Sequence, residues 1–240
     1  MATELTRRQL YLACGITASA GFVDGVGFIH LGGYFVSFMS GNSTRAGADL
    51  AEGDLLGWGK ALGLVAAFVC GVILASLVTT KNSTTTPVQG SSPLTPQLRA
   101  IWLSVGILML AAVCGTVPAA GLDTAELAVA PLIAAAMGAV NSTFTRGGEV
   151  SVGLTYMTGA LVKAGQLFAA RLRGVPETRW LRYAALWLAI AAGSAAGAIS
   201  YLAAGLVILW AAVALLACCA GLVWWRRRSA APRLHGLKHG

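Results

Sequence analysis

One short segment of the sequence occurs twice. Residues 37–41 (SFMSG) return as residues 155–159 (TYMTG), an offset of 118 positions (155 − 37), and each residue is kept or replaced by a close chemical relative. The same offset relates Arg45 to Lys163. Two copies of one unit, each about half of the chain, predict an architecture with an internal two-fold relation.

The composition places this repeated unit in a membrane. Of the 240 residues, 57% are hydrophobic and only 11% are charged, which leaves too little polar surface for a soluble domain of this size. A single apolar run that crosses a hydrocarbon core can pair all of its backbone N–H and C=O groups only as a helix. We therefore predict an all-α integral membrane protein with six transmembrane helices, at residues 9–31, 55–80, 100–117, 124–145, 180–204 and 206–225.

The charged residues sort onto two sides of such a membrane. Basic residues precede the first span, follow the second and fourth spans and form the tail, whereas the other loops are acidic and contain Asp49, Glu52, Asp54, Asp123 and Glu126. Because cytoplasmic segments are enriched in Lys and Arg, we predict a bacterial inner-membrane protein with both termini in the cytoplasm. The net charge of +8 then reflects orientation in the lipid bilayer, and we expect no nucleic-acid partner.

Segments 32–51 and 151–171 carry the repeated motif and are too polar for ordinary spans. The charge pattern makes each of them begin and end on one side, so we predict re-entrant elements in which an irregular stretch precedes a short helix. Ser40 or Asn42 would cap the first helix and Thr158 the second. Each unit then contains three spans and one re-entrant element, and an odd number of spans inverts the second unit. The units are residues 1–119 and 120–226, followed by a basic cytoplasmic tail at 227–240.

Asp24 is the strongest single candidate for a functional residue. A carboxylate near the centre of a span costs roughly 2.5–3.5 kcal/mol on insertion scales, so its presence needs a reason. One interpretation is a proton or cation site on a permeation path, and the other is a structural Asp that is protonated or paired with Arg45. Asn141, its counterpart at an offset of 117 (141 − 24), is uncharged, so only the first half can titrate here.

The repeated motif supplies the other candidates. Arg45 and Lys163 lie about one turn into the short helices, whose N-terminal ends carry partial positive charge, and this combination suits a small anion or carboxylate. Long basic side chains also snorkel to an interface, and hydroxyl and amide groups either replace a solute's hydration shell or join helices. The predicted substrate- or ion-binding residues are Asp24, Ser37, Ser40, Gly41, Asn42, Arg45, Asn141, Thr155, Thr158, Gly159 and Lys163.

These patterns favour a transporter or channel for a small solute, with a midplane site between the two units. The alternative is a non-transporting membrane scaffold or sensor. Gly193, Gly197 and the corresponding Gly71 form small-residue helix faces, which allow close contact within the fold or between subunits of a homo-oligomer. The sequence has no catalytic or phosphate-binding motif and no Cys and His spacing typical of a metal site, so we expect no enzyme activity, metal or cofactor.

The sequence resembles the YoaK family of bacterial multi-pass membrane proteins. The resemblance covers nearly the whole chain and is carried by residues 21–24 (GFVD), 33–42 (GYFVSFMSGN) and 157–159 (MTG). It implies about six transmembrane segments and an unknown function. This chain has Ser40 where the family more often has Thr, and Ala160 where Asn is expected, so Asn42 has no counterpart in the second half.

Overall fold

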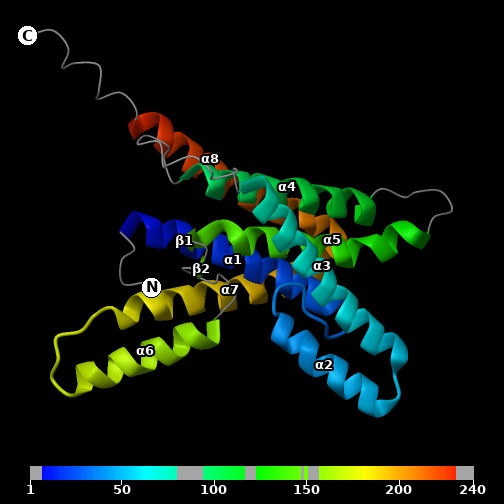
Figure 1. The fold of residues 1–240 in the computed structure, drawn as a ribbon, viewed down its shortest axis with the longest axis horizontal. Helices are drawn as coiled ribbons and strands as arrows, with labels where there is room; N and C mark the ends of the chain where they lie inside the picture. The colour runs from blue at the N-terminus through cyan, green and yellow to red at the C-terminus, as the bar shows by residue number, and fades with distance from the viewer. Residues whose placement is uncertain (1–6, 80–93, 117–122, 147–148, 151–156, 231–240) are drawn as a thin grey trace, which may run out of the picture.

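The fold is described by a computed structural model that covers residues 7–79, 94–116, 123–146, 149–150 and 157–230 (Figure 1). Its two short strands, β1 (Thr145–Arg146) and β2 (Glu149–Val150), form an antiparallel pair, and almost all else is helical. The predicted all-α class is therefore confirmed. The helices are α1 (Arg7–His30), α2 (Met39–Glu52), α3 (Leu55–Thr79), α4 (Leu94–Thr116), α5 (Asp123–Asn141), α6 (Met157–Leu172), α7 (Trp180–Ala204) and α8 (Leu209–Ala230), with short 3-10 turns η2 (Ser142–Phe144) and η3 (Gly205–Ile208).

Four stretches of the described residues are long and apolar enough to cross a membrane, where the sequence pattern predicted six. They are Leu10–His30, Leu55–Thr79, Leu98–Thr116 and the 46-residue stretch Trp180–Trp225. The last stretch contains two helices, because the chain breaks at Gly205, whose φ of 61° favours glycine. The predicted span at 124–145 is a shorter apolar helix, Ala128–Asn141, which stops before the polar residues that follow.

The long helices run alternately between two ends of the molecule (Figure 1). In that view α1, α4 and α7 run from left to right, whereas α3, α5 and α8 run back. The largest fully buried side chains include Ile16 of α1, Ile101 and Leu108 of α4, Met137 of α5 and Leu216 of α8. The core therefore lies between α1, α4, α5 and α8.

Glycines bring α1 and α7 into backbone contact. A Cβ atom added at Gly193 or Gly197 of α7 would lie 2.1 or 2.0 Å from a carbonyl oxygen of α1. Gly21 and Gly25 of α1 face carbonyl oxygens of α7 in the same way, at 2.3 and 2.1 Å. Real Cβ atoms do not approach oxygen so closely, so only glycine fits these positions. Gly193 and Gly197 thus pack within the fold.

A second glycine crossing joins α3 to α5. A Cβ atom at Gly71 would lie 1.9 Å from the carbonyl oxygen of Ala135, and one at Gly138 would lie 2.0 Å from that of Phe68. The contacts repeat those of α1 with α7, at offsets of 117 (138 − 21 and 135 − 18) and 122 (190 − 68 and 193 − 71). The matching contacts are Gly21–Ile190 with Gly138–Phe68, and Ala18–Gly193 with Ala135–Gly71.

The two short helices α2 and α6 begin near the middle of the molecule and run towards opposite ends (Figure 1). α2 packs on α3 and α6 packs on α7. An irregular stretch with positive φ at Gly32 and Gly33 leads into α2, as predicted for the first re-entrant segment. Residues 151–156 of the second predicted segment lie outside the described residues.

The predicted helix caps are wrong. The residue before α2 is Phe38, which makes no capping hydrogen bond through its side chain, and α2 already begins at Met39. Ser40 and Asn42 therefore lie inside the first turn, and Asn42 bonds to the preceding loop instead. Thr158 is likewise the second residue of α6 and not its cap.

Candidate functional site

The carboxylate of Asp24 fixes the loop between α1 and α2. Its Oδ1 atom accepts hydrogen bonds from the backbone N–H of Val36, at 2.8 Å, and of Ser37, at 2.9 Å. Asp24 lies in the last two turns of α1, so these bonds tie the loop to a long apolar helix. The Ser37 hydroxyl is buried close to the same carboxylate but has no hydrogen bond of standard geometry.

Asn42 of α2 binds the backbone of Phe35, the residue that precedes Val36 and Ser37. Its Oδ1 accepts from the Phe35 N–H at 2.9 Å, and its Nδ2 donates to the Phe35 carbonyl at 2.6 Å. The Asn42 side chain is fully buried. Together Asp24 and Asn42 accept from the backbone N–H groups of three consecutive loop residues, which irregular backbone needs when water is excluded.

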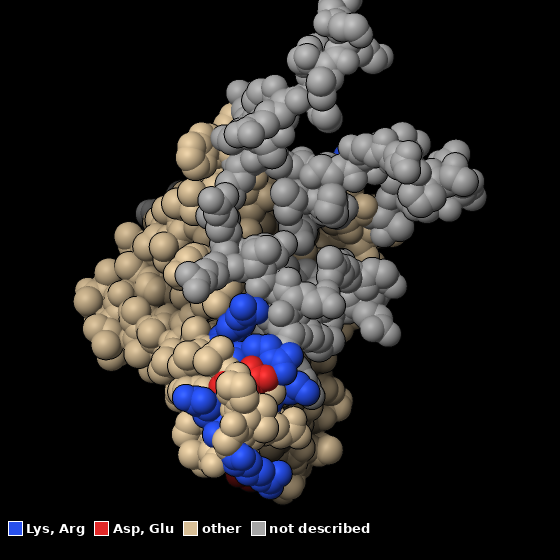
Figure 2. Space-filling view, turned by 90° about the vertical axis from the view of Figure 1, so that its left-hand side faces the viewer, with Lys and Arg blue, Asp and Glu red and all other residues tan. Residues whose placement is uncertain are grey.

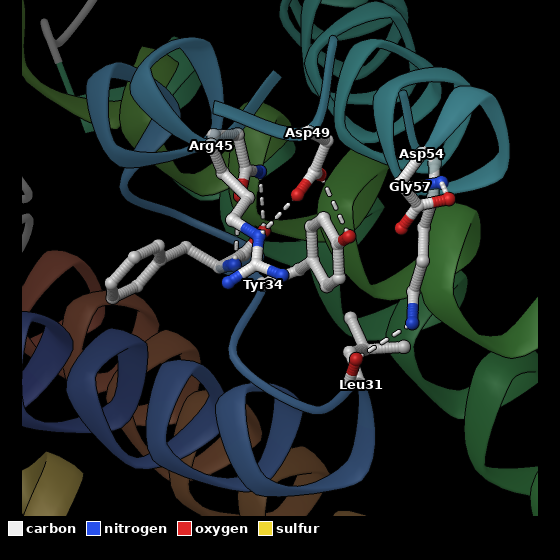
Figure 3. Close-up of polar contacts among 9 residues, drawn as sticks. Leu31, Tyr34, Arg45, Asp49, Asp54 and Gly57 are labelled. Carbon is white, nitrogen blue, oxygen red and sulfur yellow. Dashed lines mark hydrogen bonds and ion pairs between the residues drawn. The ribbon is translucent and has the colours of Figure 1, made fainter. Parts of the chain in front are cut away.

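Tyr34 is the centre of an ionic cluster between α2, α3 and the loop after α1 (Figure 3). Asp49, which is fully buried, accepts from the Tyr34 hydroxyl at 2.8 Å and from Arg45 Nε at 2.7 Å. The Arg45 guanidinium lies 5.1 Å from the centre of the Tyr34 ring, and the Lys60 ammonium lies 4.5 Å from it. Lys60 also donates to the Leu31 carbonyl at 2.6 Å. The cluster thus connects the loop after α1 with α2 and α3.

A pocket of about 230 Å³ opens beside Asp24, between α1 and α7. Asp24 is half-buried there and is the one charged group of the lining. The rings of Phe28 and Phe35 pair in the lining, with their centres 4.9 Å apart. The lining residues are Asp24, Gly25, Phe28, Phe35, Ser194 and Ala198.

The structure separates the predicted site residues into groups. Asp24, Ser37 and Asn42 meet around the loop, and Gly41 lies against it, because a Cβ there would be 2.6–2.7 Å from the Phe35 and Phe38 rings. Arg45 is exposed and pairs with Asp49, so the considered Asp24–Arg45 pair is not formed. Ser40 is exposed as well.

The second-half candidates do not reach this loop in any described contact. Asn141 donates to the Met137 carbonyl of its own helix at 2.8 Å. Thr158 and Lys163 are exposed on α6, Gly159 is half-buried beside them, and Thr155 lies outside the described residues.

Sequence reasoning missed Tyr34, Asp49 and Lys60 of the cluster, and Phe28, Phe35 and Ser194 of the pocket. The charge pattern assigns Asp49 only to an acidic loop, although its spacing of four residues from Arg45 is typical of a helical ion pair. The pocket residues come from three separate segments, and no local pattern marks them as neighbours.

Basic residues gather at one end of the molecule (Figure 2). The exposed Arg171 lies in the last turn of α6, and the exposed Arg173 and Arg179 lie in the connection to α7. Glu177 in this connection accepts hydrogen bonds from the backbone N–H and from the guanidinium of Arg179. These bonds lower the pKa of Glu177 to about 2. The acidic residues Asp49 and Asp54 belong to the opposite end, where α2 meets α3 (Figures 1 and 3).

Apolar helices of spanning length that enclose a small set of polar groups define a multi-pass membrane protein. Residues 12–222 match the family described as a protein of unknown function (DUF1275), and the chain belongs to this family. The UPF0700 transmembrane protein RA0705 of Rhizobium meliloti (strain 1021) is 33% identical over 201 residues, which cover 84% of this chain and 80% of that relative. The YoaK-type resemblance is thereby confirmed. No solved structure matches the chain.

Proposed function

We propose that this protein is a small-solute transporter or channel built from two inverted units of three spans each. The alternating directions of six long helices support this architecture, as do α2 and α6, which run from the middle towards opposite ends (Figure 1). The glycine contacts of α1 with α7, repeated by α3 with α5, further support it, because inverted repeats pack their equivalent helices alike.

The proposed orientation places the basic end in the cytoplasm of a bacterial inner membrane. The arginines around the α6–α7 connection support it, since Lys and Arg concentrate in cytoplasmic loops. The start of α1 and the end of α8 lie at the same end in Figure 1, so both termini would be cytoplasmic. Membrane-impermeant thiol labelling of Asp54→Cys and Arg173→Cys, on a background without native cysteines, tests this. Each site should label from one side only, and labelling of both from the same side contradicts the orientation.

The single observation that carries the proposed function is the Asp24 pocket. A half-buried carboxylate beside irregular backbone, near the start of a short helix, is the arrangement that transporters use to bind solutes and coupling ions. Arg45 is already held by Asp49, which weakens the case for an anion that depended on it. We infer that Asp24 binds a cation or a proton during transport.

Proton flux in proteoliposomes tests this function. The full-length protein would be reconstituted around a pH-sensitive dye and challenged with small cations, amino acids and carboxylates. We expect at least one compound to cause proton movement or to enter with the wild type, and Asp24→Asn to abolish the response. Asn keeps the Oδ1 acceptor for Val36 and Ser37, so the loop should persist.

Asp54→Asn is the matched control, because the same change is made at an exposed carboxylate whose Oδ1 accepts from the Gly57 N–H at 2.9 Å. This variant should transport like the wild type. Failure of every compound to move with the wild type, despite correct folding, would instead favour the scaffold or sensor. Equal activity of Asp24→Asn and the wild type would remove Asp24 from the mechanism.

A further inference from the structure

We propose that the Asp24 pocket binds a small organic ammonium cation, through the Asp24 carboxylate and the faces of Phe28 and Phe35. This inference names the substrate class of the proposed transport site and so rests on the proposed function. The pocket lies between α1, α7 and the loop before α2.

The charge of the lining selects a cation. Asp24 is the one ionisable residue among the six that line the pocket, and its Oδ1 is already occupied by two backbone N–H groups. The Ser37 hydroxyl lies close to the same carboxylate without a hydrogen bond of standard geometry, and the carboxylate borders the pocket. A carboxylate whose position is fixed by backbone donors is preorganised for a charge-assisted bond.

The aromatic rings select an organic cation over a hydrated metal ion. Phe28 and Phe35 present paired rings next to the carboxylate, and ring faces attract alkylammonium groups. Calcium and magnesium require about six or more oxygen ligands, whereas this lining includes one carboxylate residue and one serine. Among the described residues no group of three or more His, Cys, Asp or Glu side chains could hold a metal ion.

The size of the pocket limits the ligand. Its volume of about 230 Å³ lies below the roughly 300–1,000 Å³ of clefts that hold drug-sized molecules, so a cation with a few heavy atoms fits. Gly25 and Ala198 provide small walls, and a side chain at position 25 is excluded because its Cβ would lie 2.1 Å from the Ser194 carbonyl. A methylated or primary ammonium group meets both limits.

Ligand-observed NMR on the full-length protein in lipid-free detergent tests this binding without requiring transport. Tetramethylammonium and ethylammonium chloride are the probes, and sodium acetate is the anion control. We expect saturation transfer to the ammonium probes and none to acetate. Asp24→Asn should weaken binding at least about tenfold, and Phe28→Leu by about 2- to 30-fold, the range of single cation–π contacts.

Two matched control variants change similar side chains outside the pocket. Asp54→Asn removes an exposed carboxylate. Phe168→Leu removes a ring that is 43% exposed and paired with Trp180 at 5.0 Å, which resembles Phe28, 39% exposed and paired with Phe35. Both should bind like the wild type. Ala198→Leu fills the pocket without changing charge and should abolish binding.

The outcomes distinguish this inference from the proposed function. Absence of binding in the wild type, or equal loss in the Asp24 and Asp54 variants, overturns the ammonium site even if another solute is transported. Binding that follows the expected variants supports the site even if proteoliposomes show no flux. Displacement of the probes by phosphatidylethanolamine assigns the ammonium group to a lipid headgroup, and insensitivity to that lipid assigns it to a free solute.

Discussion

The two short helices α2 and α6 carry the two copies of the repeated sequence motif but are held in different ways. α2 is fixed by buried polar groups, namely Asn42 on the loop backbone and Asp49 on Tyr34 and Arg45. The positions that match these two residues in α6, at an offset of 118, are Ala160 and Leu167, which pack against the apolar core. Polar bonds thus hold α2 where apolar side chains pack at the matching positions of α6, while the glycine contacts of α1 with α7 are repeated by α3 with α5.

The largest effect should come from the shared crossings. Gly21→Ala and Gly138→Ala each place a methyl group 2.3 or 2.0 Å from a backbone carbonyl oxygen, which cannot yield without separating the helices. We expect each to lower the free energy of unfolding by about 3 kcal/mol or more. Melting temperatures in detergent would measure this, with Gly63→Ala and Gly106→Ala as controls, because no atom lies within 4 Å of a Cβ there. Unequal losses at Gly21 and Gly138 would break the equivalence of the two crossings.

Next in size is the removal of the α2 carboxylate. Asp49→Leu introduces the residue that α6 carries at the matching position and leaves the buried Tyr34 hydroxyl without its acceptor. We expect a loss of about 1.5–3 kcal/mol, the range of hydrogen bonds to charged groups. Thermal unfolding would measure it, and adding Tyr34→Phe should recover part of the loss because the orphaned hydroxyl is removed. A neutral Asp49→Leu would mean that the cluster does not stabilise α2.

A smaller effect is expected from exchanging the matching residues Asn42 of α2 and Ala160 of α6. Asn42→Ala removes both neutral hydrogen bonds to the half-buried Phe35 backbone and should cost about 1–2 kcal/mol. The reverse change, Ala160→Asn, should not stabilise α6. Unfolding of both variants in denaturant would show the difference. Equal effects at the two positions would contradict the asymmetry between the halves.

The smallest effect concerns the connections that follow the two helices. Asp54 accepts from the Gly57 N–H after α2, and Glu177 accepts from Arg179 after α6. The Arg179 bonds lower the pKa of Glu177 from 4.5 to about 2, so their stabilisation is present above pH 4.5 and is lost as the pH falls towards 2. The melting temperature of the wild type should therefore fall more across this window than that of Glu177→Gln. Parallel curves for the two proteins would show that this bond does not contribute.

Much of the fold could be predicted because it depends on local patterns. Apolar runs of spanning length located the long helices, and the pair Gly193 and Gly197 marked a face for close contact, which α1 occupies. The repeated motif located the irregular entry to α2. The helix caps failed because the Asn42 side chain bonds to the Phe35 backbone from inside the first turn, which residue preferences at a helix start do not reveal.

The candidate site could be predicted only in part. Asp24 was recognised from the cost of a carboxylate in an apolar run, but its bonds to Val36 and Ser37 depend on how the loop folds back. The pocket also needs Ser194, which lies 170 positions after Asp24 (194 − 24) and reaches it only through the crossing of α1 with α7. Long-range packing of similar apolar helices leaves no local signal in the sequence.

That crossing also sets the order in which the protein can be completed. During synthesis α1 enters the membrane long before α7 is made. Its glycine face is therefore exposed to lipid until a helix near the other end of the chain packs against it. The face of α3 waits in the same way for α5. A chain that ends before α5 contains neither partner helix, so both glycine faces stay unburied and expose the product to membrane proteases.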